Sequence, residues 1–237
     1  AAASLDSTGL LLSRGSNHQR APAIAYSSNR WLVSFGDSRV AGDEIHSVRM
    51  SNAGVIASDL TTSAAPQHQR GAVSAYDGTN FIVGWTDPRN ADDDVYAARV
   101  SPLGTLIDTS GIRLTSAVGD EYVTGAASSS NRTLLVWQQK VAGSYDVYGA
   151  ILNNSGGIAL PAFVISNAVG DQLEPKVDFE ASAGVFVVVW QDERAGIAAD
   201  DIYGARVTTG GVVQDVAGVA ISTATLQQAV PEVGCGN

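Results

Sequence analysis

The chain has 237 residues, with 14 Lys and Arg against 24 Asp and Glu and a formal net charge of −10 at pH 7. This acidic balance argues against a nucleic-acid partner, because the phosphate backbone requires a basic surface. The longest uninterrupted apolar run, residues 185–190, is far too short to cross a bilayer, so we expect no membrane insertion. The single cysteine, Cys235, cannot close an internal disulfide.

One sequence pattern occurs four times at intervals of about fifty residues. The copies begin at Arg30, Asn80, Arg132 and Val185. Their central aromatic residues are spaced 50, 52 and 53 residues apart and are Phe35, Trp85, Trp137 and Trp190. A fixed period of this size is typical of a solenoid or a propeller.

Each copy predicts four short strands, which are clearest in the second copy. Residues 72–76 supply the first strand, and residues 81–85 alternate apolar side chains between two faces before a polar turn. Residues 95–100 alternate again and end at a Ser-Pro-Leu-Gly turn, after which residues 105–117 can supply an outer strand. Four strands in one fifty-residue repeat make one blade of a β-propeller.

The two ends of the chain carry incomplete copies. Residues 5–22 align with the outer strand of a copy and the opening strand of the next, and the segment from Gln228 aligns with an opening strand. Five opening and five outer strands therefore accompany only four central hairpins. We predict one all-β propeller domain over residues 1–237, with four complete blades and a partial fifth blade or ring-closing seam formed by the termini. Residues 230–233 should then pair near residues 9–12, unless the chain is cut from something longer.

The second copy reads W-x-D-x-R from Trp85, then a short polar loop, then D-V-Y-A-A-R-V from Asp94. This unit resembles the repeats of large secreted bacterial β-propeller proteins and, more distantly, the TolB-type propeller repeat. The resemblance covers nearly the whole chain and implies a propeller located outside the cell, in the periplasm or on the cell surface. It does not specify a function, because such propellers serve as binding platforms, ligand-binding domains and enzyme accessories.

The polar residues of the repeat predict an arginine–carboxylate clamp. Asp87 and Arg89 end one strand and Asp94 begins the next, so an ion pair across the hairpin is geometrically easy. The same trio recurs as Asp37, Arg39 and Glu44, and as Asp192, Arg194 and Asp201. An anion or metal site is the alternative interpretation. The third copy has Gln139 and Val141 instead, through drift or specialisation. The central aromatic residues should pack between blades rather than stack on sugars.

A second constellation suggests a metal site on the propeller axis. The residues that precede the first four opening strands are His18, His68, Asp120 and Asp171. If the opening strands are innermost, these side chains surround one mouth of the central channel and suit one divalent ion, calcium or a transition metal. The next residues would add amide oxygens and are Gln19, Gln69, Glu121, Gln172 and Gln228. The alternative is a polar, water-filled mouth.

No catalytic motif stands out in the sequence. We therefore expect a non-enzymatic recognition module, secreted or surface-exposed, that binds a carbohydrate or protein ligand on one propeller face. A hydrolase- or lyase-type enzyme that uses a metal or a polar site at the axial channel mouth is the second interpretation. A structural array element is the third, self-associating through the terminal seam or Cys235.

Overall fold

The computed structural model describes residues 9–13, 15–40, 42–57, 59–196 and 200–236. In these residues sixteen strands form four antiparallel sheets of four strands each. No helix in this part of the chain is long and apolar enough to cross a membrane.

Each sheet corresponds to one copy of the repeat, with its strands hydrogen-bonded in chain order. The first sheet contains β1 (Gln19–Ser27), β2 (Arg30–Val40), β3 (Gly42–Ser51) and β4 (Leu60–Ser63). The second contains β5 (Arg70–Tyr76), β6 (Phe81–Asp87), β7 (Asp94–Val100) and β8 (Ile112–Arg113). The third contains β9 (Glu121–Ser128), β10 (Arg132–Val141), β11 (Ser144–Asn153) and β12 (Ile158–Ser166). The fourth contains β13 (Gln172–Glu180), β14 (Val185–Asp192), β15 (Asp201–Thr208) and β16 (Val219–Ser222).

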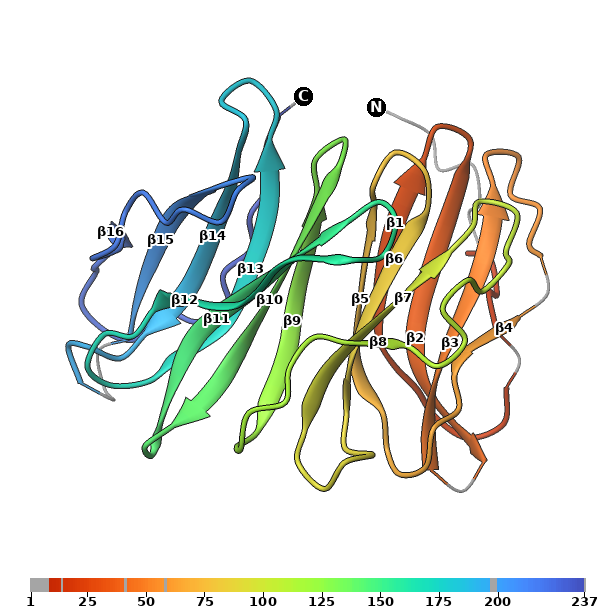
Figure 1. The fold of residues 1–237 in the computed structure, drawn as a ribbon, viewed down its shortest axis with the longest axis horizontal. Coiled ribbons are helices and arrows are strands. Elements are labelled where there is room, and N and C mark those ends of the chain that lie inside the picture. Colours follow the sequence, from red (N-terminus) through yellow and green to blue (C-terminus); the bar gives the residue numbers. More distant parts are fainter. Residues whose placement is uncertain (1–8, 14, 41, 58, 197–199, 237) are drawn as a thin grey trace.

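The four sheets follow one another in chain order across the molecule (Figure 1). Their first strands contact each other in sequence, β1 with β5, β5 with β9 and β9 with β13. The opening strand of each repeat is therefore the innermost strand of a blade. The prediction of a β-propeller with four complete blades is confirmed.

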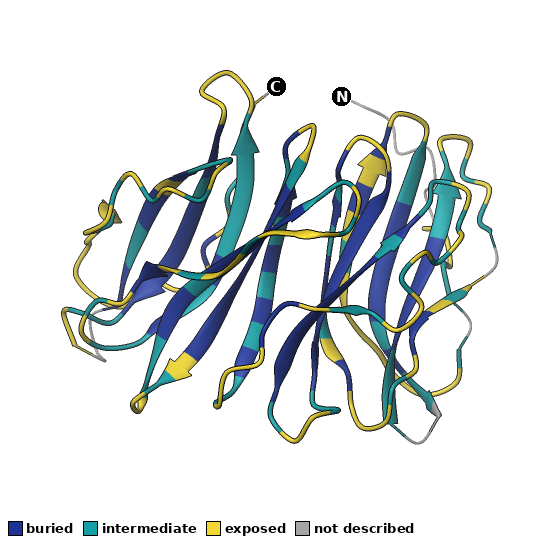
Figure 2. Ribbon diagram, in the orientation of Figure 1, coloured by how far each residue is buried: buried dark blue, intermediate teal, exposed yellow. Residues whose placement is uncertain are grey.

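Apolar side chains from neighbouring blades form the core between the sheets. Trp85, Trp137 and Trp190 are fully buried, each on the second strand of its blade. Trp85 packs with Leu32 and Ile45 of the preceding blade. Figure 2 shows that buried residues follow the middle strands while the turns are exposed. These indoles thus form the layer between blades that the period-two alternation predicted.

The clamp exists, but Arg89 pairs with only one of the two carboxylates of the predicted trio. Arg89 pairs with Asp87 of its own strand, not with Asp94 across the hairpin. The guanidinium of Arg89 lies over the ring of Tyr96, 4.2 Å from its centroid. Asp94 pairs instead with Arg113 of β8 at 2.9 Å. Of the predicted trio, the Arg89–Asp87 pair is therefore formed and the ion pair across the hairpin to Asp94 is not.

The third blade lacks the clamp for a local reason. Val141 pairs with Ser144, so β10 and β11 are joined by a two-residue turn. Ala142 and Gly143 in this turn have φ values of 51° and 106°, the left-handed conformations that such hairpins require. Gln139 replaces the aspartate and accepts a 3.2 Å hydrogen bond from Trp137 Nε1.

The C-terminal segment, residues 228–236, occupies the place of a fifth innermost strand. The backbone N–H of Gln228 donates to the carbonyl of Asp200 at 2.8 Å, as that of Gln69 donates to Asp43 at 2.9 Å. Further along, the N–H of Cys235 donates to Asp178 Oδ2 of β13 at 2.7 Å.

The first sheet is covered at the other end of the chain, where Leu12 packs against Val33 and Phe35. Within the described residues, the hydrogen bonds of the C-terminal segment go to the fourth blade. The predicted pairing of residues 230–233 with residues 9–12 is therefore not formed.

Candidate functional site

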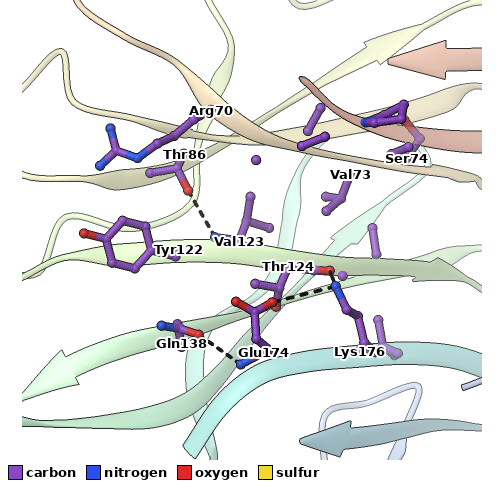
Figure 3. Close-up of a pocket in the computed structure, with 18 of the residues that line it drawn as sticks. Arg70, Val73, Ser74, Thr86, Tyr122, Val123, Thr124, Gln138, Glu174 and Lys176 are labelled. Atoms are coloured by element: carbon purple, nitrogen blue, oxygen red, sulfur yellow. Dashed lines mark hydrogen bonds and ion pairs between the residues drawn. The ribbon is translucent and has the colours of Figure 1, made fainter. Parts of the chain in front are cut away.

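The innermost strands enclose a cavity of about 670 Å³ on the axis of the propeller. Its walls come from β1, β5, β9 and β13 and from Glu232 and Val233 of the C-terminal segment. Every blade therefore contributes to one concave surface. Figure 3 shows the polar side chains of β5, β9 and β13 that line it.

A recurrent backbone irregularity shapes this wall. The pairing of β1, β5 and β13 with the next strand shifts register near the start of the inner strand. Ala21, Gly71 and Glu174 lie at the shift with positive φ values of 46°, 68° and 50°. Gly71 adopts this conformation without strain, whereas the side chains of Ala21 and Glu174 make it sterically unfavourable at those two positions. Extra residues at these bulges interrupt the hydrogen-bonded ladder and line the cavity.

One wall of the cavity carries a cation, an aromatic ring and a carboxylate. Arg70 of β5 forms an ion pair with Asp93 and lies 5.4 Å from the ring centroid of Tyr122. Burial raises the pKa of Asp93, and the opposing charge of Arg70 lowers it. Asp93 is nine-tenths buried while Arg70 is nearly half exposed, so the carboxylate fixes the direction of the guanidinium.

The opposite wall carries a carboxylate and an amine. Lys176 Nζ lies 3.9 Å from Glu174 Oε2 and donates a 3.2 Å hydrogen bond to the carbonyl of Thr124. The backbone N–H of Glu174 donates to Gln138 Oε1 at 2.9 Å, which fixes the bulge. Glu232 adds a second carboxylate from the C-terminal segment. The cavity thus offers acidic groups, cationic groups and a phenol ring to one ligand.

A buried hydroxyl group, that of Thr86, links the second and third blades beneath the wall that carries Arg70 and Tyr122. Thr86 Oγ1 accepts a 3.1 Å hydrogen bond from the N–H of Val123 and donates to the carbonyl of Glu121 at 3.2 Å. Both residues flank Tyr122, so this joint fixes the position of the aromatic ring.

The metal ring predicted at the channel mouth is not formed. His18 and His68 are exposed, and His68 Nδ1 accepts a 3.2 Å hydrogen bond from the N–H of Asp43. Asp171 Oδ1 accepts from the N–H of Tyr145 at 3.0 Å, while Asp120 is half-buried. Among the described residues, no group of three or more His, Cys, Asp or Glu side chains could hold a metal ion. His18, His68, Asp120 and Asp171, all within the described part of the chain, do not come together as one ligand set.

The amide ring predicted next to it also has a different role. Gln69 and Gln172 are fully buried, and their amide groups donate to carbonyls of their own preceding loops rather than facing the axis. The predicted amide ring lies one to four residues before the first residues that line the cavity. The signal that sequence reasoning missed is the charged and aromatic residues inside the opening strands, namely Arg70, Tyr122, Glu174, Lys176 and Glu232.

Comparison with known proteins gives the fold of the chain. No family model and no curated protein matches the sequence. An α-L-arabinofuranosidase from Lactobacillus brevis has a TM-score of 0.56 at 10% identity over 85% of this chain and 77% of that chain. A GH43 endo-arabinanase from Bacillus licheniformis has a TM-score of 0.52 at 12% identity over 91% and 84%. The GH62 α-L-arabinofuranosidase catalytic domain of Coprinopsis cinerea has a TM-score of 0.55 at 11% identity over 97% and 78%.

These similarities overturn the expectation of a non-enzymatic recognition module. The three structures named above are two α-L-arabinofuranosidases and an endo-arabinanase, so the enzymatic alternative, with a polar site on the axial channel, fits the comparison better. The likeness itself is one of fold, since identity is low. A function must therefore be argued from the residues of the cavity.

Proposed function

We propose that this chain is a carbohydrate-active hydrolase whose substrate binds in the axial cavity, with Glu174 and Glu232 as the reacting carboxylates. The observation that carries the proposal is that both carboxylates line one cavity of about 670 Å³. Glycoside hydrolysis generally needs two carboxyl groups, one to protonate the leaving oxygen and one to act as nucleophile or base. A cavity of this volume lies within the range of small-molecule sites.

The other groups of the cavity suit a sugar ligand. Arg70 is directed by Asp93, and its remaining N–H groups can donate to ring or hydroxyl oxygens. Tyr122 offers an aromatic face and a phenol hydroxyl next to it. Thr124 and Gln138 add neutral polar groups from the wall that carries Glu174 and Lys176. Fixed donors and acceptors of this kind orient a substrate before bond cleavage.

The substrate class follows by analogy with the similar folds. Arabinofuranosidases, an endo-arabinanase and an endo-1,4-β-xylanase share the fold, so pentose-containing oligosaccharides are the first substrates to test. Fold similarity alone does not carry a specificity, and other oligosaccharides belong in the same screen.

The test is release of reducing sugar from arabino- and xylo-oligosaccharides by the wild type and by Glu174→Gln and Glu232→Gln. Each variant should reduce the rate by at least a hundredfold, the scale of general acid–base catalysis, while retaining oligosaccharide binding in calorimetry. Glu180→Gln is the control, because Glu180 lies at the exposed end of β13 and bonds Ser182 instead of lining the cavity.

Hydrolysis that both cavity variants retain would contradict the assignment of the reacting groups. Absence of both binding and hydrolysis across the panel of oligosaccharides would contradict the proposed function itself.

A further inference from the structure

Glu121 occupies a position of the repeat at which the other opening segments carry glutamine. Its counterparts are Gln19, Gln69, Gln172 and Gln228. Glu121 is fully buried, as Gln69 and Gln172 are, and its side chain does not line the axial cavity. A carboxyl group therefore lies in a buried site that is built for an amide.

The glutamines show what that site requires. Gln69 Nε2 donates to the carbonyls of Ala65 at 2.8 Å and Gln67 at 3.0 Å. Gln172 Nε2 donates to Ala168 at 3.1 Å and Gly170 at 3.0 Å. The amide thus ties down the tight loop before the inner strand by bonding carbonyls four and two residues earlier. By the same offsets, the carbonyls that face Glu121 belong to Ala117 and Gly119.

At the repeat position where the glutamines supply an amide donor, the ionised carboxyl group of Glu121 supplies only acceptor oxygens. Its Oε2 accepts a 2.9 Å hydrogen bond from Thr115 Oγ1, and Thr115 in turn accepts from the N–H of Val95 at 2.8 Å. Its Oε1 is buried and has no hydrogen-bond partner in the structure. An ionised carboxylate cannot donate to a carbonyl, whereas a protonated one can.

The charges around Glu121 oppose ionisation overall. The negative charges of Asp94 on β7 and of Asp92 in the loop before it raise the pKa of Glu121, and the positive charge of Arg113, which pairs with Asp94, lowers it. The backbone carbonyl of Asp93, in the same loop, accepts a 3.0 Å hydrogen bond from the backbone N–H of Glu121. The side chain of Asp93 forms an ion pair with Arg70. On Glu121's own strand, Asp120 and Tyr122 flank it, and β10 presents the neutral Gln139 opposite. Burial is the largest influence and raises the pKa of Glu121 to about 7 from its ordinary value of 4.5.

We propose that Glu121 is a proton-operated latch: protonated, it holds the loop of residues 117–120 as the glutamine amides hold theirs, and ionised, it releases that loop. We assign the proton to Oε1, because Oε2 already accepts from Thr115 and Oε1 has no partner. The latch lies one residue before Tyr122, and the Glu121 carbonyl accepts from Thr86. Release of the loop therefore loosens the wall of the axial cavity at the second and third blades, whatever ligand the cavity binds.

The direction of the pH dependence follows because the pKa of Glu121 is higher in the folded protein than in the unfolded chain. Below about pH 4.5 both states are protonated and the latch stabilises fully. Between about pH 4.5 and 7 the unfolded chain ionises first, so stability falls as the pH rises. Above about pH 7 the folded carboxyl is ionised as well, and the stabilisation is lost.

The experiment compares the wild type with Glu121→Gln, which restores the residue of the other blades. Carbon-detected NMR of the glutamate carboxyl groups should show one group that titrates near pH 7 in the wild type and is missing from the variant. The melting temperature of the wild type should drop by several degrees more than that of Glu121→Gln between pH 5.5 and 8.5. At pH 8, amide exchange of residues 117–123 should be faster in the wild type than in Glu121→Gln, and at pH 6 the two should match.

Gln172→Glu is the reciprocal variant, since it places the same carboxyl in the fourth blade. It should add a second pH-dependent loss of melting temperature and faster exchange at residues 168–174 at pH 8. A Glu121 carboxyl that titrates below pH 5.5 would overturn the latch, even if Gln172→Glu does not fold. Melting curves of wild type and Glu121→Gln that shift equally with pH would also overturn it.

Discussion

Trp190 Nε1 donates a 2.7 Å hydrogen bond to Asp192 Oδ2, so one buried carboxylate ties the core indole to the end of its strand. Arg194 engages the same carboxylate through Nε at 2.8 Å and stacks on Tyr203, 3.8 Å from the ring centroid. Trp85, Asp87 and Arg89 repeat this arrangement in the second blade. The recurring polar residues of the repeat therefore stabilise the second and fourth blades from within.

Arg89→Ala should destabilise the second blade by about 1–3 kcal/mol, because it removes the cation from a buried carboxylate. Asp87 is fully buried, while Arg89 is only one-fifth exposed. Denaturant unfolding measures the loss. Arg206→Ala is the control, since Arg206 is 58% exposed in its pair with Asp215 and should change stability little. Equal losses in both variants would contradict a special role for the clamp.

Asp108→Asn should destabilise the protein at pH 7 by about 1–3 kcal/mol and have little effect in strong acid. Hydrogen bonds from Arg99 lower the pKa of Asp108, with distances of 2.8 Å from both Nε and Nη2. A lowered folded pKa gives stability that is present above the unfolded value and lost as the pH falls through the folded value. Urea midpoints at pH 2.5, 4 and 7 check this. A difference between wild type and variant that does not shrink in acid would refute it.

Deleting residues 230–237 should open the fourth blade in particular. The segment buries Pro231 and supplies the N–H of Cys235 to Asp178. Without it, Asp178 of β13 loses its hydrogen-bond donor, and the side of β13 that the segment contacts becomes exposed. Amide exchange should accelerate in β13–β15 and change little in β5–β7. Uniform protection across all blades would show that the segment does not stabilise the ring.

Thr86→Val should destabilise the joint between the second and third blades by about 1–3 kcal/mol, since it leaves the N–H of Val123 and the carbonyl of Glu121 without their partner. Thr86→Ser keeps the hydroxyl and should retain most of the stability. Thermal unfolding compares the two. If the serine variant is as unstable as the valine variant, packing of the methyl group matters more than the hydrogen bonds.

The sequence by itself determined the blade and its repetition. The alternation around Trp85 and the fifty-residue period are local patterns, and each blade forms from residues close together in the chain. The same comparison correctly identified Gln228 as the start of a fifth inner segment. It also placed the indoles between blades, because a large apolar side chain at a fixed place in every copy has only the neighbouring blade to pack against.

Only the tertiary structure decided what the polar residues do. Repeat alignment places His18 and Asp171 at equivalent positions, but it cannot give side-chain direction: Asp171 accepts from the backbone of Tyr145 in the neighbouring blade, while His18 is exposed. Arg89 pairs with Asp87 and not with Asp94, and its guanidinium lies over the ring of Tyr96 on the next strand. The axial cavity joins Arg70, Glu174 and Glu232, which are far apart in the chain and meet only when the innermost strands converge. Side-chain direction and long-range convergence depend on packing between blades, which no local sequence pattern records.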